Sequence, residues 1–122
     1  RILENVRGRM LEEIVLLETM AANPKPRDIF EGREVFKLMF ESGEFDMVVR
    51  DLEAGTCEIC EIKHSKEAVD EQFRHLVDTD KCAQVERLFG RISSRKVYYR
   101  GPDFIHPSGV EYLNVEKYLK NL

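Results

Sequence analysis

Asp46, Glu61 and Lys63 are the residues of this chain whose types and spacing best suit catalysis. Asp46 lies in an alternating run over residues 44–51, and Glu61 and Lys63 lie in a second run over 56–63. The short turn between the runs predicts a β-hairpin. Counting outward from the turn places Asp46 and Glu61 opposite each other. Glu61 and Lys63 are two positions apart and therefore share one face of their strand.

Two carboxylates in this arrangement are suited to hold one divalent cation. Mg²⁺ prefers hard oxygen ligands and retains several waters, and such an ion polarises a phosphodiester oxygen and activates a bound water. A neighbouring lysine can orient that water or stabilise charge that develops on phosphorus. We therefore expect Asp46 and Glu61 to bind Mg²⁺ or Mn²⁺ and to cluster with Lys63 at one end of the hairpin, on the face covered by the first helix. For Glu61 and Lys63 alone, the competing interpretation is a solvated strand face.

A helix over residues 2–22 is the strongest local prediction. Its apolar residues recur at three- and four-residue steps, and the stripe predicted to face the core consists of Leu3, Val6, Met10, Ile14 and Leu17, widened by Leu11 and Val15. On a helical wheel Glu13 and Glu18 border this stripe, whereas Glu12 lies further round. The wheel thus favours Glu13 as the helix glutamate that faces the sheet.

The rest of the chain alternates between strands and helices. The elements that we predict around the hairpin are, in order, a strand over 35–40 buried on both sides, a helix over 66–77 with Ser65 as its N-cap, a helix capped by Asp78 or Thr79 and stopped by Gly90, a strand over 96–100, a loop over 103–109, a strand over 110–113 and a helix from Asn114 to Leu122. This order predicts one α/β domain over residues 1–122, with a mixed sheet and helices on its faces.

Gln72 is a polar residue on the inward side of the predicted 66–77 helix, with Val69, Phe73, Leu76 and Val77. A buried glutamine needs hydrogen-bond partners, and near the end of the second hairpin strand these could be a carboxylate or a bound phosphate. The alternative, a glutamine at the wet edge of the apolar stripe, stays equally open.

Composition and charge limit the classes of function. The chain is 43% hydrophobic and 34% charged, with a net charge of −4, which disfavours tight nucleic-acid binding by this domain alone. A local basic cluster over 91–100, with two interleaved tyrosines, is the exception. No apolar run approaches a membrane span and no signal peptide opens the chain, so we expect a cytoplasmic protein with no membrane partner. The start at Arg1, inside a helical pattern, suggests a domain cut from a longer polypeptide.

The three cysteines, Cys57, Cys60 and Cys82, are expected to be free thiols without zinc. Cys57 and Cys60 have the spacing of a zinc motif, but both fall in a predicted strand, where residues three apart point to opposite faces. An odd number of cysteines also gives no disulfide framework.

Six short motifs spread over nearly the whole chain carry a family resemblance: Gly8-Arg9-Met10-Leu11-Glu12, Gly43-Glu44-Phe45-Asp46, Glu61-Ile62-Lys63-His64-Ser65, Gln72-Phe73-Arg74-His75-Leu76, Tyr99-Arg100-Gly101 and Tyr112-Leu113-Asn114-Val115-Glu116. With these motifs the chain resembles the PD-(D/E)xK nuclease superfamily, which has a restriction-endonuclease-like α-β-β-β-α-β core. More closely, it is similar to the C-terminal domain attached to a group of bacterial and archaeal AAA-type ATPases. A phenylalanine rather than a proline precedes the motif aspartate, a departure common in the superfamily.

The resemblance assigns roles to five residues: Asp46 and Glu61 as metal ligands, Lys63 as the catalytic lysine, Glu12 as the first-helix glutamate and Gln72 as the second-helix glutamine. It therefore favours Glu12 where the helical wheel favours its neighbour. The implied activity is metal-dependent hydrolysis of phosphodiesters. The implied partners are nucleic acid, DNA in the first place, bound weakly by the isolated domain, and an ATPase domain of the same chain through which oligomers could form.

Two further hypotheses stay open beside the nuclease. One is a nuclease-like module that does not cleave, but positions a nucleic acid or a protein partner for its ATPase. The other is a folding or dimerisation appendage without a ligand. The three motif residues favour catalysis, whereas the net charge is unfavourable for it.

Overall fold

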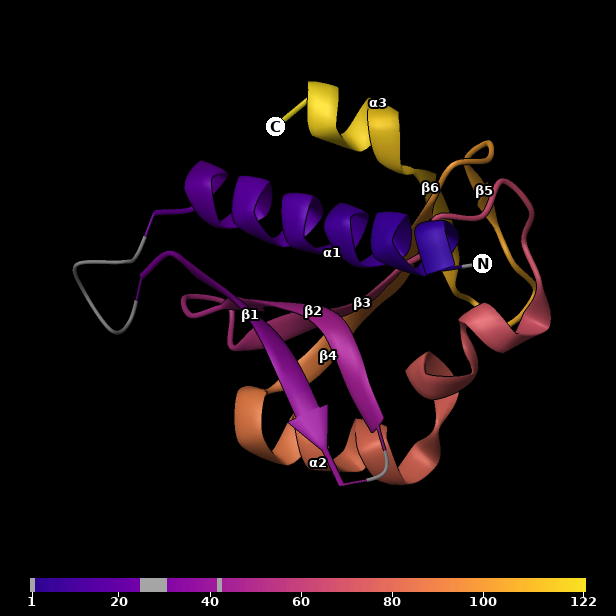
Figure 1. Ribbon diagram of the computed structural model, residues 1–122. Helices are drawn as coiled ribbons and strands as arrows, with labels where there is room; N and C mark the ends of the chain where they lie inside the picture. Colours follow the sequence, from indigo (N-terminus) through magenta and orange to yellow (C-terminus); the bar gives the residue numbers. More distant parts are fainter. Residues whose placement is uncertain (1, 25–30, 42) are drawn as a thin grey trace.

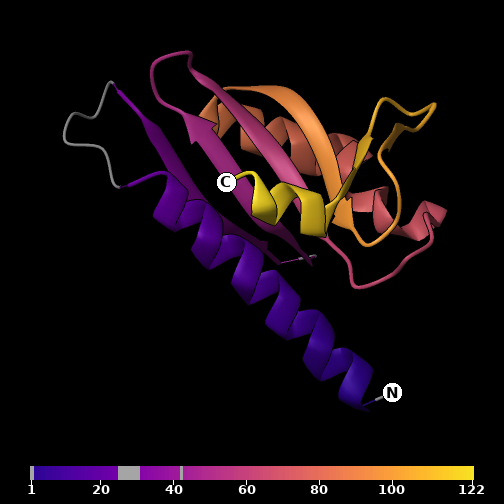
Figure 2. The same cartoon turned by 90° about the horizontal axis from the view of Figure 1, so that it is seen from above.

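A six-stranded mixed sheet separates two layers of helix in the computed structural model, which describes residues 2–24, 31–41 and 43–122, with the backbone alone for residues 2–6 and 70. Helices α1 (Ile2–Ala22) and α3 (Val115–Lys120) lie on one side of the sheet, and α2 (Thr79–Phe89) lies on the other (Figures 1 and 2). The predicted fold class, an α/β domain with a mixed sheet, is confirmed.

The strands follow one another across the sheet in the order β1-β2-β3-β4-β6-β5. The pairs β1–β2, β2–β3 and β5–β6 are antiparallel, whereas β3–β4 and β4–β6 are parallel. The bounds of the strands are β1 Arg33–Phe40, β2 Gly43–Asp51, β3 Thr56–Ile62, β4 Arg91–Tyr99, β5 Phe104–Ile105 and β6 Glu111–Asn114. The parallel crossover from β3 to β4 carries α2, which is why this helix covers the centre of the sheet.

The predicted hairpin is formed by β2 and β3, and Met47 pairs with Cys60. Its turn depends on Gly55, whose φ of 68° is accessible to glycine at little energetic cost. The Asp51 carboxylate accepts a hydrogen bond of 2.9 Å from the backbone N–H of Ala54 and stabilises the same turn. This register places Asp46 and Glu61 next to each other, one position beyond the pair of Met47 and Cys60, as the count from the turn predicts.

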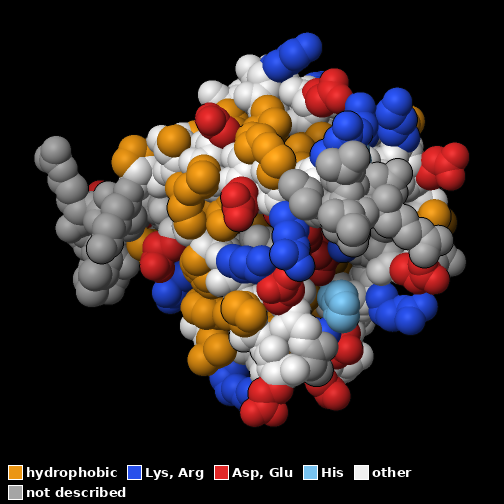
Figure 3. All heavy atoms as spheres, in the orientation of Figure 1, with side chains coloured by type: hydrophobic (Ala, Val, Ile, Leu, Met, Phe, Trp, Pro, Cys, Tyr) orange, Lys and Arg blue, Asp and Glu red, His pale blue; other side chains and the backbone are white. Residues whose placement is uncertain are grey.

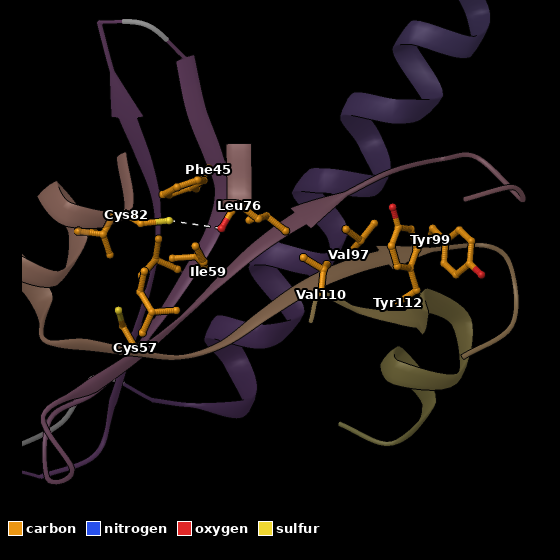
Figure 4. Close-up of a cluster of buried hydrophobic side chains, with 12 residues drawn as sticks. Phe45, Cys57, Ile59, Leu76, Cys82, Val97, Tyr99, Val110 and Tyr112 are labelled. Atoms are coloured by element: carbon orange, nitrogen blue, oxygen red, sulfur yellow. Dashed lines mark hydrogen bonds between the residues drawn. The ribbon is translucent and has the colours of Figure 1, made fainter. Parts of the chain in front are cut away.

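Each face of the sheet has its own apolar core. On the α2 side, Phe45 and Ile59 pack with Leu76 and Cys82 (Figure 4), and the Cys82 thiol donates a hydrogen bond of 3.3 Å to the Leu76 carbonyl. On the α1 side, the buried cluster consists of Val15, Met47, Val49, Cys60, Ile62, Tyr98 and Val115. The hairpin is thus buried on both faces, although its strands are antiparallel.

A β-bulge interrupts β2 at Asp46. Phe36 of β1 pairs with Val48 and Leu38 pairs with Phe45, so two residues of β2, Asp46 and Met47, lie opposite one residue of β1. The bulge changes the alternation of the strand, since Phe45 and Val48, three positions apart, both face the α2-side core. The sequence pattern gave no sign of this extra residue.

The face of α1 that contacts the sheet differs from the predicted stripe. Val15 and Thr19 are fully buried, and the Thr19 hydroxyl lies 2.8 Å from the Tyr118 hydroxyl of α3. Met10, Ile14 and Leu17 are 55%, 45% and 62% exposed, so their predicted burial is wrong. Apolar residues occur on two sides of this helix, and a wheel cannot tell which of them meets the sheet. The side chains of Leu3 and Val6 lie outside the described part.

The predicted helix over 66–77 is wrong. This segment contains two short 3₁₀ helices, Asp70–Gln72 and Arg74–Val77, and α2 begins only at Thr79. Ser65 does not cap a helix: its hydroxyl accepts a bond from the N–H of Glu67 and donates to the carbonyl of the same residue. Only part of the predicted apolar stripe is buried, because Leu76 is fully covered whereas Val69 and Val77 are 46% and 42% exposed.

Other boundaries agree with the sequence more closely. The Asp78 carboxylate caps α2 by accepting from Lys81 N–H, and Asn114 caps α3 through Lys117 N–H. Strand β4 begins at Arg91, five residues before the prediction, and β5 occupies part of the predicted loop. Strand β1 lies at the sheet edge with Met39 73% exposed, so burial on both sides is wrong for this strand. None of the helices in the described residues is long and apolar enough to cross a membrane.

Candidate functional site

The Asp46 carboxylate is held at the centre of the candidate site by the backbone of β3. It is 5% exposed, and its Oδ2 accepts a hydrogen bond of 2.8 Å from the Ile62 N–H. In a regular strand pair, a backbone carbonyl would accept this N–H. At the bulge, the Asp46 side chain accepts it instead. This bond fixes the carboxylate beside Glu61 before any ligand is bound.

Glu61 is the most deeply buried acid of the site, with 2% of its surface exposed. Burial raises the pKa of Glu61 to about 10, and the neighbouring Asp46 carboxylate, to which a protonated Glu61 can donate, acts in the same direction. Within the described residues, Glu61 Oε1 is fully buried without a hydrogen-bond partner. A buried carboxyl oxygen of this kind is costly unless a proton, a water or a cation satisfies it.

Lys63 lies directly after β3, where its N–H donates to the Tyr98 carbonyl. Its Nζ is 3.8 Å from Glu61 Oε2, and its side chain is 36% exposed. The ammonium charge lowers the pKa of Glu61, but burial and Asp46 outweigh it. Lys63 is therefore placed beside the carboxyl pair without neutralising it, and its amine remains accessible from solvent.

Glu12 and Glu44 complete an acidic group around Asp46. One carboxylate oxygen of each of these three residues lies within 4.8 Å of the others. Burial raises the pKa of the half-buried Glu12 carboxyl most, and the charge of Asp46 raises it further. Glu13, which the helical wheel favoured, is exposed on α1, so Glu12 is the glutamate that reaches the site. Glu44 was part of a sequence motif but was not predicted to reach the site.

The three predicted residues lie together at one end of the hairpin. Cys57 and Ile59 of β3 face the α2-side core, whereas Cys60 and Ile62 face the α1-side core. Alternation therefore places Glu61 on the α2 side. Glu12 of α1 nevertheless reaches Asp46, and its charge acts on Glu61, so the first helix does pass this end of the hairpin, and one shared face for all three residues stays a prediction.

Gln72 is buried, as one interpretation required, but its hydrogen bonds go to the backbone. Its Oε1 accepts from Val69 N–H at 3.0 Å, and its Nε2 donates to the Glu67 carbonyl at 3.0 Å. The expected carboxylate or phosphate partner is thus replaced by the loop before the first 3₁₀ helix. Gln72 shapes the segment that follows Lys63 and does not contact the acids.

The cysteines are separated as the strand argument predicted. Cys57 belongs to the α2-side core and Cys60 to the α1-side core, so they point to opposite faces. Burial raises the pKa of Cys57 to about 11 and that of Cys60 well above the usual range. All three cysteines are buried free thiols, and the group of possible metal ligands in the described residues consists of carboxylates. The absence of zinc stays a prediction.

The basic cluster over 91–100 is not an open cationic surface. Lys96 forms a 2.6 Å ion pair with a glutamate of β3, and Arg100 lies 3.6 Å from a glutamate of α3. Arg95 donates to the Leu76 carbonyl, and both tyrosines are buried. Consecutive strand residues point to opposite faces, so a cluster in the sequence is divided between two sides of the sheet.

A separate apolar groove of about 560 Å³ lies along the edge strand β1. It is lined by Met20, Val35, Phe36, Leu38 and Phe89, with Arg33, Glu34 and Asn23 at its polar side. None of the sequence-predicted site residues lines this groove. Size alone therefore does not identify the site; the buried carboxyl pair does.

Protein-family models, curated proteins and solved structures were compared with the chain, and none of them matched.

We predict that Glu61 makes the metal-free protein less stable as the pH rises. The folded state holds the Glu61 pKa above its unfolded value of 4.5, so from that value to about 10 it binds more protons than the unfolded state. This difference lowers the free energy of unfolding by up to about 1.4 kcal/mol per pH unit. Urea unfolding between pH 5 and 9 in EDTA should show Glu61→Gln gaining stability relative to wild type. Glu53→Gln in the exposed turn is the control, and a pH-independent difference for Glu61→Gln would contradict the prediction.

We predict that Gln72→Ala destabilises the protein by about 0.5–1.5 kcal/mol, because the Val69 N–H and the Glu67 carbonyl lose their part-buried hydrogen bonds to this side chain. Gln72→Glu should keep the acceptor for Val69 N–H and lose only the donated bond, so it should be intermediate in urea unfolding. Exposed Glu71→Ala is the neighbouring control. A Gln72→Ala protein of wild-type stability would return this residue to a direct role at the site.

Proposed function

We propose that this chain is a metal-dependent nuclease domain of the PD-(D/E)xK type that hydrolyses phosphodiester bonds. The observation that carries the proposal is the buried pair of Asp46 and Glu61, with Lys63 Nζ 3.8 Å from Glu61. The order of one helix, three antiparallel strands, a helix and a parallel strand supports a restriction-endonuclease-like core. Four of the motif residues, Glu12, Asp46, Glu61 and Lys63, lie close together at this place in the fold, which supports the proposal.

The residues present fit Mg²⁺ or Mn²⁺. The candidate ligands are oxygen donors, which these ions prefer, and the buried Glu61 Oε1 has no hydrogen-bond partner among the described residues. Asp46 and Glu61 would hold the ion, with Glu12 or Glu44 at the other side of Asp46. When bound, the ion supplies positive charge that polarises a phosphodiester and activates water. It also offsets the repulsion of two buried carboxylates, which the protein meets by protonation in its absence.

Lys63 and Asp46 would have different roles at the reacting phosphate. Lys63 is close enough to Glu61 to approach the same phosphate, and its exposed amine can stabilise the charge that develops on the phosphoryl oxygens. Water attacks phosphorus, the bond between phosphorus and the leaving oxygen breaks, and the products are a phosphate monoester and an alcohol. Asp46 stays oriented by the Ile62 N–H throughout this step.

The setting that we propose is a cytoplasmic protein in which an AAA-type ATPase domain in the same chain delivers nucleic acid, DNA in the first place. A net charge of −4 favours such delivery over tight binding by the domain itself. The same charge favours a second candidate, a module that binds nucleic acid or a protein partner for the ATPase without cleaving. Measured cleavage separates the two candidates.

We predict that Mg²⁺ or Mn²⁺ raises the melting temperature of the wild type and leaves that of Asp46→Asn unchanged. At ten times the dissociation constant, one bound ion stabilises the folded state by about 1.4 kcal/mol, which corresponds to roughly 5 °C for a domain of this size. Without metal, Asp46→Asn should be as stable as the wild type or slightly more stable, because it removes one of two neighbouring acids. Thermal scans with Asp51→Asn as a control in the hairpin turn measure this.

The matched variant for catalysis is Lys63→Met, which should keep the metal-induced shift and lose cleavage of a DNA duplex by about 100-fold or more. A metal-induced shift in wild type without cleavage would support the second candidate. Equal responses of wild type and Asp46→Asn to millimolar metal would refute the nuclease proposal and leave only the fold.

A further inference from the structure

Lys81 and His75 form a buried polar pair on the α2 side of the site. Lys81 is 5% exposed on α2, and its Nζ lies 2.5 Å from Nδ1 of His75, which is half-buried in the second 3₁₀ helix. Buried lysines are rare, and neither residue was predicted to act at the site. The proposed metal ligands lie on other elements and leave this pair without a role.

The chemistry of the pair determines which hydrogen bond His75 can still make. A lysine ammonium can only donate, so Nδ1 accepts and the proton of a neutral imidazole lies on Nε2. Burial lowers the pKa of His75, and the charges of Lys81 and Lys63 act in the same direction, against Asp78 and Asp46. These effects favour the neutral form of the ring. Within the described residues, Nε2 has no hydrogen-bond partner, so its N–H is a donor available to a ligand.

The location of the pair connects it to the candidate site. Gly43 begins the strand that carries Asp46, and a Cβ at Gly43 would lie 3.0 Å from Lys81 Nζ and 3.4 Å from His75 Cε1. The charges of Lys63 and Asp46 both affect the pKa of His75, so the ring lies within electrostatic reach of the site. On the face of the molecule that Figure 3 shows, acidic and basic side chains lie side by side. Acids thus lie toward α1, and nitrogen donors lie toward α2.

We propose that His75 contacts a backbone phosphate of the nucleic acid through Nε2–H and that Lys81 positions the ring. The bound nucleic-acid strand therefore lies on the α2 side of the carboxyl pair. This inference rests on the proposed nuclease function and adds the side from which the substrate is held. A phosphate is the anion that fits, because N–H donors and the Lys63 and Lys81 ammonium groups favour a compact anion. The ring touches the ligand, whereas Lys81 acts through the ring.

The test is nitrogen NMR of the His75 ring in EDTA, with His75→Ala for assignment. Titration with a six-nucleotide oligothymidylate should shift the Nε2 resonance and raise the His75 pKa, since a bound phosphate favours the imidazolium. His75→Ala should weaken oligonucleotide binding about tenfold, as expected for one hydrogen bond to a charged group. His75→Gln, which keeps an N–H donor, should restore part of the affinity. Lys81→Met should abolish the ring shift, Lys81→Arg should retain it, and exposed Arg87→Ala is the control on α2.

The outcomes separate this inference from the nuclease proposal. Oligonucleotide binding that leaves the His75 resonance and the His75→Ala affinity unchanged would overturn the inference, even if metal-dependent cleavage is found. No response of the ring to any phosphate would overturn it as well. A response to inorganic phosphate but not to the oligonucleotide would assign the contact to a free anion and overturn the nucleic-acid assignment. A response to the oligonucleotide without any metal-induced shift would support the phosphate contact and refute the nuclease.

Discussion

The hydrogen bond from Ile62 N–H to the Asp46 carboxylate is the interaction on which the site depends. It joins the two strands of the central hairpin where their regular pairing stops, and it holds the extra residue of the β2 bulge in one orientation. The register that pairs Met47 with Cys60 continues to Asp46 and Glu61, which therefore lie opposite each other on adjacent strands. Binding one carboxylate to the backbone of the next strand fixes it beside the second acid, and the other parts of the site are arranged around this pair.

Burial of that acid pair determines its chemistry. Two carboxylates in a poorly hydrated place cannot both ionise cheaply, so the more deeply buried Glu61 holds its proton well above the usual pH range. Lys63 is too distant and too exposed to cancel this effect. Loss of the Glu61 proton is therefore unfavourable in the metal-free protein, and a bound cation would favour it. Perturbed acids in this setting are typical of functional sites more than of structural ion pairs.

The side chains around the acid pair differ between the two faces of the sheet. Glu12 and Glu44 lie toward α1, with Asp46 between them and the acid on β3. Lys81 and His75 lie toward α2 and touch the start of the strand that carries Asp46. In our proposal a phosphate of the nucleic acid contacts these nitrogen groups on the α2 side of the acids. The basic run of β4, by contrast, is divided between two faces and used in internal pairing.

The sequence by itself determined the α/β class, the hairpin with its Gly55 turn, the caps of α2 and α3, and the proximity of Asp46 and Glu61, because these depend on local pattern and on counting along paired strands. Its motifs also favoured Glu12, the helix glutamate that lies near Asp46, where helical periodicity favoured the neighbouring residue. Only the tertiary structure decided which apolar face of α1 meets the sheet, since two faces were available to the same periodicity. The bulge at Asp46, the backbone partners of Gln72 and the meeting of His75 with Lys81 were decided there as well, because each depends on contacts between distant segments that no local spacing encodes.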